Sequence, residues 1–431
     1  MRRVPLATTI VLLIFPSLAL GQGAEVCAAS RSMEAAGPTQ GVITPAEVCR
    51  VLSALADDSL QGRGTGTEGG AKAARFIANE MKAAGLEPGG DSGFFQRVPV
   101  VRGTTRSGRA AAVSSFSVRD TFPVERRGVA VNVIGILRGS DPKLKDSVIL
   151  VDAHYDHLGM RAGGGIDVDS VQAFAAMSAP ILAERSRFAQ ANNISTRGRG
   201  GAQMTDEQRK AMDAFQTRIE AIRVNMDSVR HAHPKARIDS IYNGADDDAS
   251  GTTAVIEIAK QLAKGPRPKR TIVFAATTGE ESGLIGTRWY IDHPVLPLVA
   301  MQANLEIEMI GRADSLAGGP GRAWLTGYER STMGQMFTSA GLAVVPDKRP
   351  DQQFFNRSDN IAFARMGVPA HTLSSFNLHT DYHQLTDDIT TIDFAHVAGV
   401  INIGVKAVDL LANGPVPHWN PGGQPQAPAR P

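Results

Sequence analysis

Residues 244–262 have the sequence GADDDASGTTAVIEIAKQL, and this segment decides which fold class the chain can form. Three adjacent aspartates stand directly before residues 251–262, where we expect a helix. The apolar stretch TIVFAA at residues 271–276 follows and is typical of a buried strand. A helix followed closely by a buried strand indicates a layered α/β protein.

The same alternation extends outward from this segment in both directions. Further strands are predicted at residues 129–137, 147–152, 304–310 and 369–373, and further helices at residues 44–56 and 68–84. These elements predict a mostly parallel mixed central sheet with helices on both faces, an α/β/α sandwich. Ligands bind at the carboxyl ends of strands in such sheets, which is where charged residues cluster in this sequence.

One segment interrupts this alternation. Residues 160–242 are polar, and we expect them to be an insertion with helices at residues 170–189 and 205–230. The remainder, residues 22–159 and 243–414, is then a single domain. Residues 415–431 are rich in proline and glycine, which predicts a disordered tail. The insertion is either a lid over the ligand site or a surface attachment.

The first 21 residues have the pattern of a signal peptide. Two arginines precede an apolar run over residues 4–20, and small residues follow it. The alternative is a membrane anchor, which the short, proline-interrupted run disfavours. We therefore expect a secreted or periplasmic protein with no stable membrane span in the mature chain. Cys27 and Cys49 could pair in an oxidising compartment or remain as thiols.

Composition excludes one class of partner. The chain has 431 residues, of which 42% are hydrophobic and 20% charged, and its formal net charge is +2. That balance is typical of a soluble protein with a sizeable core. It gives no reason to expect a nucleic-acid partner.

Five short clusters of histidine and carboxylate residues stand out: two follow predicted strands, one ends a strand, one opens a predicted helix and one lies in a late loop. They are HYDH at 154–157, GADDDASG at 244–251, GEESG at 279–283, EIE at 306–308 and HTDYH at 379–383. Nitrogen and oxygen donors without cysteine suit zinc in an open catalytic site. In the Glu-Glu pair, one carboxylate can bind metal while the other takes a proton from water. Taken alone, the aspartates could instead be an acidic helix start.

The five clusters together resemble the M28 family of zinc aminopeptidases. That family has, in the same order, His-x-Asp, Gly-Ala-Asp-Asp-x-Ala-Ser-Gly, Glu-Glu, an acidic residue at a strand end and a late histidine. The stretches LQGRGTG at 60–66, NVIG at 132–135, RSD at 357–359 and GVP at 367–369 are also similar to bacterial members. The resemblance covers residues 46–160 and 243–412 and does not cover the insertion.

The resemblance implies a role for each matched position. Asp247 would bridge two zinc ions; His154 and Glu308 would complete one site, and Glu281 and His383 the other. Glu280 would be the general base, and Asp156 would hydrogen-bond the His154 ring. His383 is favoured over His379 because Asp387 follows it by four residues, as in the family.

Two further positions are less certain on sequence. Glu308 is favoured over Glu306 because it stands directly before MIGR at 309–312, and Glu306 remains the alternative. His157 is expected to be a loop residue near the site without direct contact to a metal.

The implied activity is hydrolysis of the N-terminal peptide bond of peptides with a free N-terminus. A carboxypeptidase or a dipeptidase on the same fold is the alternative, because these share the metal chemistry. A glutaminyl-cyclase-like enzyme is similar in fold but uses a single zinc ion, against which the five implied ligands argue. A binding protein on a degenerate peptidase scaffold would lack ligands, and none is missing here. The preferred N-terminal side chain does not follow from the sequence.

Overall fold

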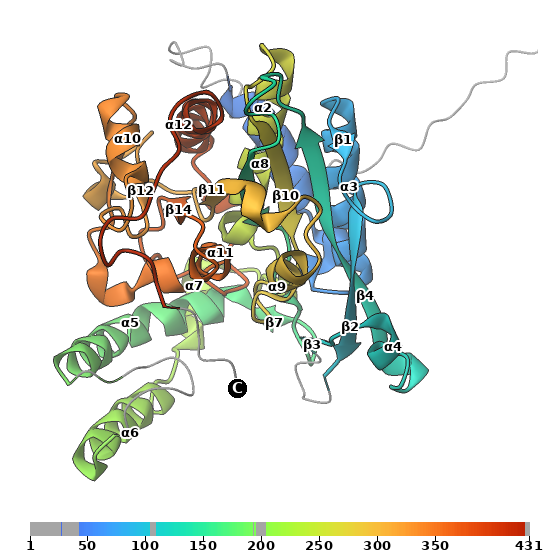
Figure 1. Ribbon diagram of the computed structural model, residues 1–431. Coiled ribbons are helices and arrows are strands. Elements are labelled where there is room, and N and C mark those ends of the chain that lie inside the picture. The colour runs from blue at the N-terminus through green and yellow to red at the C-terminus, as the bar shows by residue number, and fades with distance from the viewer. Residues whose placement is uncertain (1–26, 28–42, 104–108, 193, 195–203, 427–431) are drawn as a thin grey trace, which may run out of the picture.

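A ten-stranded mixed sheet forms the centre of the molecule (Figure 1). The computed structural model describes Cys27 and residues 43–103, 109–192, 194 and 204–426, so the predicted signal peptide lies outside the described residues. The strand order is β13-β12-β14-β11-β5-β10-β4-β2-β3, with β1 paired to β4. The strands are β1 (Glu87–Pro88), β2 (Phe95–Arg102), β3 (Ala110–Ala112), β4 (Arg127–Leu137), β5 (Val148–His154), β10 (Thr271–Thr277), β11 (Met301–Ile307), β12 (Ala323–Leu325), β13 (Val344–Pro346) and β14 (Ala370–Ser374).

The centre of the sheet is parallel and its flanks are largely antiparallel. Strands β14, β11, β5 and β10 run parallel to one another. On one flank β4 and β2 run antiparallel, and on the other β12 is antiparallel to β14. The four parallel strands therefore direct their carboxyl ends to one edge, and this edge carries the predicted clusters.

Helices cover both faces of the sheet, which confirms the α/β/α sandwich. One face packs against α2 (Pro45–Leu55), α3 (Glu68–Ala83), α8 (Gly251–Lys264) and α12 (Phe394–Asn413). The other face packs against α9 (Ile285–Asp292) and α11 (Asn360–Arg365). In β5, Ile149 and Val151 belong to the first core and Val148 and Leu150 to the second, as the two-residue period of a strand requires.

Helix α12 is long and apolar enough, by length and composition, to cross a membrane. Its side chains are mostly buried in the first core, where the helix packs against α8 and α2. This is the usual position of a core helix in an α/β sandwich. The shorter helices α4 (Phe116–Arg119) and α10 (Met333–Ser339) lie at the two flanks of the sheet (Figure 1).

The insertion begins and ends at two short antiparallel pairs. Strand β6 (Gly159–Met160) pairs with β9 (Ile241–Tyr242), and β7 (Ile166–Asp167) pairs with β8 (Ile238–Asp239). Beyond them lie α5 (Val168–Ala191), α6 (Asp206–Glu220) and α7 (Met226–Ala232). Figure 1 shows α5 and α6 extending away from the sheet.

The prediction of a single helix over residues 205–230 was wrong, because the structure has two helices there. The first helix ends at Glu220, and the Asn225 side chain then accepts a hydrogen bond from the Ser228 amide and caps a new helix. In a continuous helix this amide would bond to a backbone carbonyl of the preceding turn. An asparagine N-cap supplies the acceptor where a new helix begins. The chain therefore turns between α6 and α7.

The predicted disordered tail is also wrong for residues 415–426. The Trp419 indole donates a hydrogen bond to the carbonyl of Gly367 at 2.9 Å, and its ring packs on Phe355 and His371. A proline- and glycine-rich composition does not distinguish an extended segment packed on a surface from a disordered one. Residues 427–431 lie outside the described residues.

Cys27 and Cys49 form a disulfide with their Cα atoms 5.6 Å apart. Of the two states that the sequence left open, the structure has the paired one. Cys49 lies in α2, so the bond attaches the preceding segment to the first core. Cross-links of this kind stabilise mainly by restricting the unfolded chain.

Candidate active site

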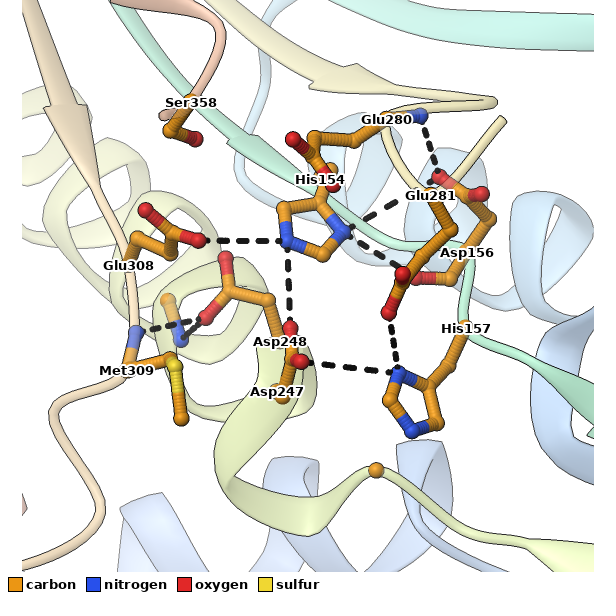
Figure 2. A network of polar contacts seen from close by, with 12 residues as sticks. His154, Asp156, His157, Asp247, Asp248, Glu280, Glu281, Glu308, Met309 and Ser358 are labelled. Atoms are coloured by element: carbon orange, nitrogen blue, oxygen red, sulfur yellow. Dashed lines mark hydrogen bonds and ion pairs between the residues drawn. The ribbon is translucent and has the colours of Figure 1, made fainter. Parts of the chain in front are cut away.

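Residues of four predicted clusters come together at the carboxyl edge of the parallel strands (Figure 2), and His383 of the fifth contacts two of them. His154 is the last residue of β5, and the Glu280–Glu281 pair follows β10 in the adjoining loop. Glu308 follows β11 directly, so the predicted strand at residues 304–310 ends before this side chain. Asp247 lies in the turn that precedes α8.

A first group joins His154, Asp247 and Glu308. The His154 Nε2 atom lies 3.3 Å from Asp247 Oδ1 and 3.8 Å from Glu308 Oε1. The imidazole of His154 is fully buried. These three side chains carry donor atoms within 4.8 Å of one another, a spacing at which one metal ion could contact all of them.

A second group shares Asp247 with the first. The His383 Nε2 atom lies 3.1 Å from Asp247 Oδ2 and 3.1 Å from Glu281 Oε1. His157 enters the same group: its Nδ1 atom lies 2.8 Å from Glu281 Oε1 and 3.9 Å from Asp247 Oδ2. Figure 2 shows the His157 ring directed at these two carboxylates. His157 thus lies near the site, as expected, and its ring also contacts two carboxylates of the cluster.

The donor atoms of these residues are arranged to bind metal ions and do not satisfy one another by hydrogen bonds. His154 Nε2, His157 Nδ1, Asp247 Oδ2 and Glu281 Oε1 are buried atoms with no hydrogen-bond partner. Leaving such atoms unpaired is costly, whereas a shared cation would satisfy all of them. Two ligands of one tetrahedral zinc lie about 3.4 Å apart, given metal–ligand distances of about 2.1 Å. Most of the observed donor separations are close to that value.

The charges of the second group follow from its close contacts. Although burial opposes the charged imidazole, Asp247 and Glu281 raise the pKa of His383 to about 9. Burial and the Asp247 charge oppose ionisation of Glu281, but the His157 and His383 rings bring its pKa down to about 2. Both carboxylates of this group are thus held ionised, which is the form that binds a cation.

Asp156 acts differently from the role expected of it. Its carboxylate accepts hydrogen bonds from the Thr65 hydroxyl at 2.7 Å and from the Glu280 amide at 3.1 Å. The His154 Nδ1 atom instead hydrogen-bonds the Asp156 backbone carbonyl at 3.1 Å and lies 3.9 Å from the carboxylate. The ring is still oriented by Asp156, but through its main chain, because the carboxylate is already engaged. Burial raises the pKa of Asp156 to about 6.

Glu280 faces the same space without joining either group. Burial raises the pKa of its carboxyl well above the usual range, and Glu308 and Asp359 add to this despite the opposing effect of His154. The Asp156 contact fixes its backbone. A carboxylate that resists ionisation beside the cluster has the affinity for protons that a general base needs.

Glu306 and Glu308 occupy different environments. Glu306 is fully buried and accepts hydrogen bonds from Ser358 Oγ and the Asp359 amide through one oxygen, and from Thr372 and the Asn360 amide through the other. Its oxygens are satisfied and do not reach the cluster. Glu308 is the acidic side chain that faces His154.

The two late histidines also separate. His379 Nε2 lies 2.9 Å from Asp246 Oδ2, whereas His383 contacts Asp247 and Glu281. Asp387 accepts hydrogen bonds from the Asp246 and Asp247 amides at 3.0 Å, which holds the aspartate turn beneath the late loop. Of the two histidines, His383 is the one that contacts both carboxylates of the second group.

Arg63 supports the turn from the other side and was missed as a site residue. Its buried guanidinium donates to the carbonyls of Asn243, Gly244, Tyr155 and Leu55. Burial lowers the pKa of Arg63 to about 10, and the nearby aspartates oppose that shift. The signal in the sequence was the arginine inside the glycine-rich stretch LQGRGTG.

A small cavity of about 40 Å³ opens beside the first group. Three carboxylates, Met309, four aromatic side chains and four polar side chains line it. The carboxylates are Asp247, Glu280 and Glu308, and the polar residues are Thr326, Arg357, Thr372 and Ser374. The aromatic residues are Trp324, Phe354, Phe376 and Tyr382. No described residue between 161 and 242 lines this cavity or the second one, which lies beside His157 and Glu281.

Fold and site together define an α/β protein with a candidate two-cation centre at the carboxyl edge of its sheet. The model of peptidase family M28 matches residues 225–406 of the chain. The match contains four of the five clusters; the HYDH cluster at 154–157 precedes it.

Known proteins resemble parts of the chain. It is 29% identical over 146 residues to leupeptin-inactivating enzyme 1 of Streptomyces exfoliatus, covering 32% of this chain and 31% of that protein. It is 26% identical over 200 residues to a probable glutamate carboxypeptidase of Arabidopsis thaliana, covering 39% and 28%. The chain thus spans less than a third of the length of these relatives.

Among solved structures, a zinc aminopeptidase from Bacillus subtilis superposes with a TM-score of 0.50. The superposition covers 86% of this chain and 95% of that one, at 13% sequence identity. A likeness at this identity concerns the fold alone.

Proposed function

We propose that this chain is a secreted or periplasmic zinc-dependent peptidase that hydrolyses the N-terminal peptide bond of peptides. The observation that carries the proposal is Asp247, whose two carboxylate oxygens face two different groups of donors. His154 and Glu308 would hold one zinc ion with Asp247, and Glu281 and His383 the other. When bound, the two ions would polarise the scissile carbonyl and lower the pKa of the attacking water.

The residues of the chain divide the remaining work. Glu280 accepts a proton from the water as it attacks the carbonyl carbon, and later donates that proton to the departing amine. The Asp156 carboxylate fixes the Glu280 backbone through the 3.1 Å hydrogen bond. His154 is held in one orientation by the carbonyl of Asp156, which fixes the tautomer that leaves Nε2 unprotonated.

The small cavity supports an exopeptidase. Three carboxylates of the site line it, and its volume of about 40 Å³ suits one short side chain at the end of a peptide. The names of the Bacillus and Streptomyces proteins and of the Arabidopsis relative include both an aminopeptidase and a carboxypeptidase, so the choice of end requires an experiment.

The test compares three substrate types on the zinc-loaded protein. Amino-acid anilides with a free amine, their N-acetylated forms and N-blocked peptides with a free carboxyl end are incubated with and without a chelator. We expect hydrolysis of the free anilides alone, lost on metal removal and restored by zinc. Cleavage of the blocked peptides instead would indicate a carboxypeptidase, and full activity after metal removal would contradict the proposal.

Two alternatives receive their own measurements. A glutaminyl-cyclase-like enzyme would convert an N-terminal glutamine to pyroglutamate without hydrolysis, which mass spectrometry detects. A binding protein would retain peptides without cleaving them. For the cellular location, expression of the full chain in a bacterium with N-terminal sequencing of the exported product tests cleavage near residue 21.

A further inference from the structure

The cavity beside the first group contains one cationic side chain. Arg357 lines it together with Asp247, Glu280 and Glu308. Its guanidinium carbon lies 4.8 Å from the ring centre of Phe354 and 6.0 Å from that of Tyr382. Rings at these distances hold the guanidinium through cation–π contacts.

Arg357 lacks the hydrogen-bonding or anionic partners that other partly or fully buried arginines of this chain have. Its Nη1 atom is buried without a hydrogen-bond partner, and no ion pair within 4.0 Å joins it to another residue of the described part of the chain. By contrast, Arg349 contacts Asp314 through two nitrogens, and Arg63 donates to four carbonyls. A buried charged donor without a partner is costly, so this position is suited to an incoming acceptor.

The charge of the occupied site points to the same conclusion, which rests on the proposed function. Asp247, Glu281 and Glu308 carry three formal negative charges, fewer than the four positive charges of two zinc ions. The guanidinium would then be an uncompensated cation within the cavity. An arginine in this setting recognises a carboxylate through paired N–H groups.

We propose that Arg357 binds a carboxylate of the substrate, and that the enzyme therefore prefers an aspartate or glutamate at the substrate N-terminus. The aromatic walls position the guanidinium, and the volume of about 40 Å³ fits a short side chain. The same carboxylate chemistry could come from the C-terminal end of a dipeptide. The experiment therefore needs one arm for each source.

The first arm compares glutamyl and glutaminyl 4-nitroanilides, which are nearly the same size and differ in charge. We expect kcat/KM of the wild type to favour the glutamyl substrate by roughly 10- to 100-fold, the range of a hydrogen bond to a charged group. Arg357→Gln should bring this ratio near one, mainly through a higher KM for the glutamyl substrate. Arg357→Lys, which keeps the charge but not the paired geometry, should give an intermediate ratio.

The second arm compares the dipeptide Ala-Ala with its C-terminal amide. A preference for the free dipeptide that disappears in Arg357→Gln would assign Arg357 to the terminal carboxylate, and would overturn the preference for an acidic first residue. Arg322→Gln is the matched control, because Arg322 is exposed and lies outside the cavity lining. Its two substrate ratios should equal those of the wild type.

Zinc content and melting temperature of every variant separate a loss of recognition from a loss of structure. If Arg357 only packs on Phe354 and Tyr382, Arg357→Gln changes all substrates by the same factor, and the proposal is wrong. If the wild type cleaves neutral substrates in a zinc-dependent way without any preference for a carboxylate, the proposal alone fails. If it cleaves no substrate, the proposed function fails instead.

Discussion

His157 Nδ1 lies 2.8 Å from Glu281 Oε1, yet the two side chains do not form a hydrogen bond of acceptable geometry. The nitrogen lone pair is therefore available to a cation between Glu281 and Asp247. We expect His157→Asn to lower the zinc content from two ions per chain to about one, measured by mass spectrometry of metals after dialysis. Loss of a residue that contacts and orients metal ligands typically weakens metal binding by about 10- to 100-fold.

The matched control for this change is His231→Asn. His231 is an exposed residue of α7 in the insertion and lines neither cavity beside the cluster. Cobalt substitution adds a readout that is independent of turnover. The visible absorption of the cobalt protein should lose the contribution of one site in His157→Asn and keep it in the control. If His157→Asn still binds two zinc ions with unchanged affinity, His157 has no part in metal binding and only makes a structural contact with Glu281.

Replacement of Glu280 tests the proton transfer separately from metal binding. Glu280→Gln retains the size of the side chain and its backbone contact with Asp156 but removes the proton acceptor. We expect kcat to fall by about 10²- to 10⁴-fold, with zinc content and melting temperature close to those of the wild type. Retention of more than a tenth of the wild-type kcat would assign the general base to another group.

Replacing Glu306 should lower the stability of the fold, whereas replacing Glu308 should weaken zinc binding. Glu306→Gln puts an amide NH₂ against donors that need an acceptor, and we expect a loss of about 1–3 kcal/mol in the free energy of unfolding. Glu308→Gln should leave the unfolding free energy of the metal-free protein nearly unchanged and weaken binding of one zinc ion. Denaturant titrations of the stripped proteins, followed by zinc titrations, distinguish the two outcomes.

The sequence predicted the layers and most of the cluster because both depend on local pattern. Strands β5, β10 and β11 are short apolar runs, and the site residues at or shortly after their carboxyl ends lie at the same edge. The contribution of His157 could not be predicted in this way. Whether the fourth residue of HYDH turns back toward the cluster depends on Gly244, against which its ring packs, and Gly244 is distant in sequence.

Other features depended on tertiary contacts that no pattern reports. Asp156 is one example. Its carboxylate binds the Glu280 amide and its backbone carbonyl binds the His154 ring, and the sequence does not tell which group of one residue binds which partner. The packing of residues 415–426 is another, because Trp419 finds its partners on β14 and near α11.

The insertion can be removed at its base. Residues Met160 and Ile241 are paired across β6 and β9, so a two-residue Asn-Gly turn could replace residues 161–240. Because no described residue of that segment lines either cavity beside the cluster, we expect unchanged kcat/KM for amino-acid anilides. A shift of the preferred peptide length in the shortened protein would instead support a lid that limits substrate size.

His371 predicts how stability responds to acid. Its ring is fully buried, donates from Nδ1 to the Thr326 carbonyl at 2.7 Å and accepts at Nε2 from the Ser331 hydroxyl at 2.6 Å. Burial lowers its pKa to about 4, and the nearby Arg330 charge acts in the same direction against the Thr326 hydrogen bond. The ring is therefore neutral in the folded protein and takes up a proton in the unfolded chain near pH 6.5.

The free energy of unfolding therefore decreases as the pH falls below about 6.5. Above pH 6.5 neither state binds the proton and His371 has no effect on the pH dependence; as pH falls from 6.5 toward 4, the unfolded chain gains it and stability is lost. Relative to His371→Gln, the wild type should lose about 2–3 kcal/mol of unfolding free energy between pH 7.5 and pH 4.5. Urea titrations at both values check this, and comparison with the variant cancels acid effects at the metal cluster. Parallel pH dependences for the two proteins would mean that the buried ring does not resist protonation.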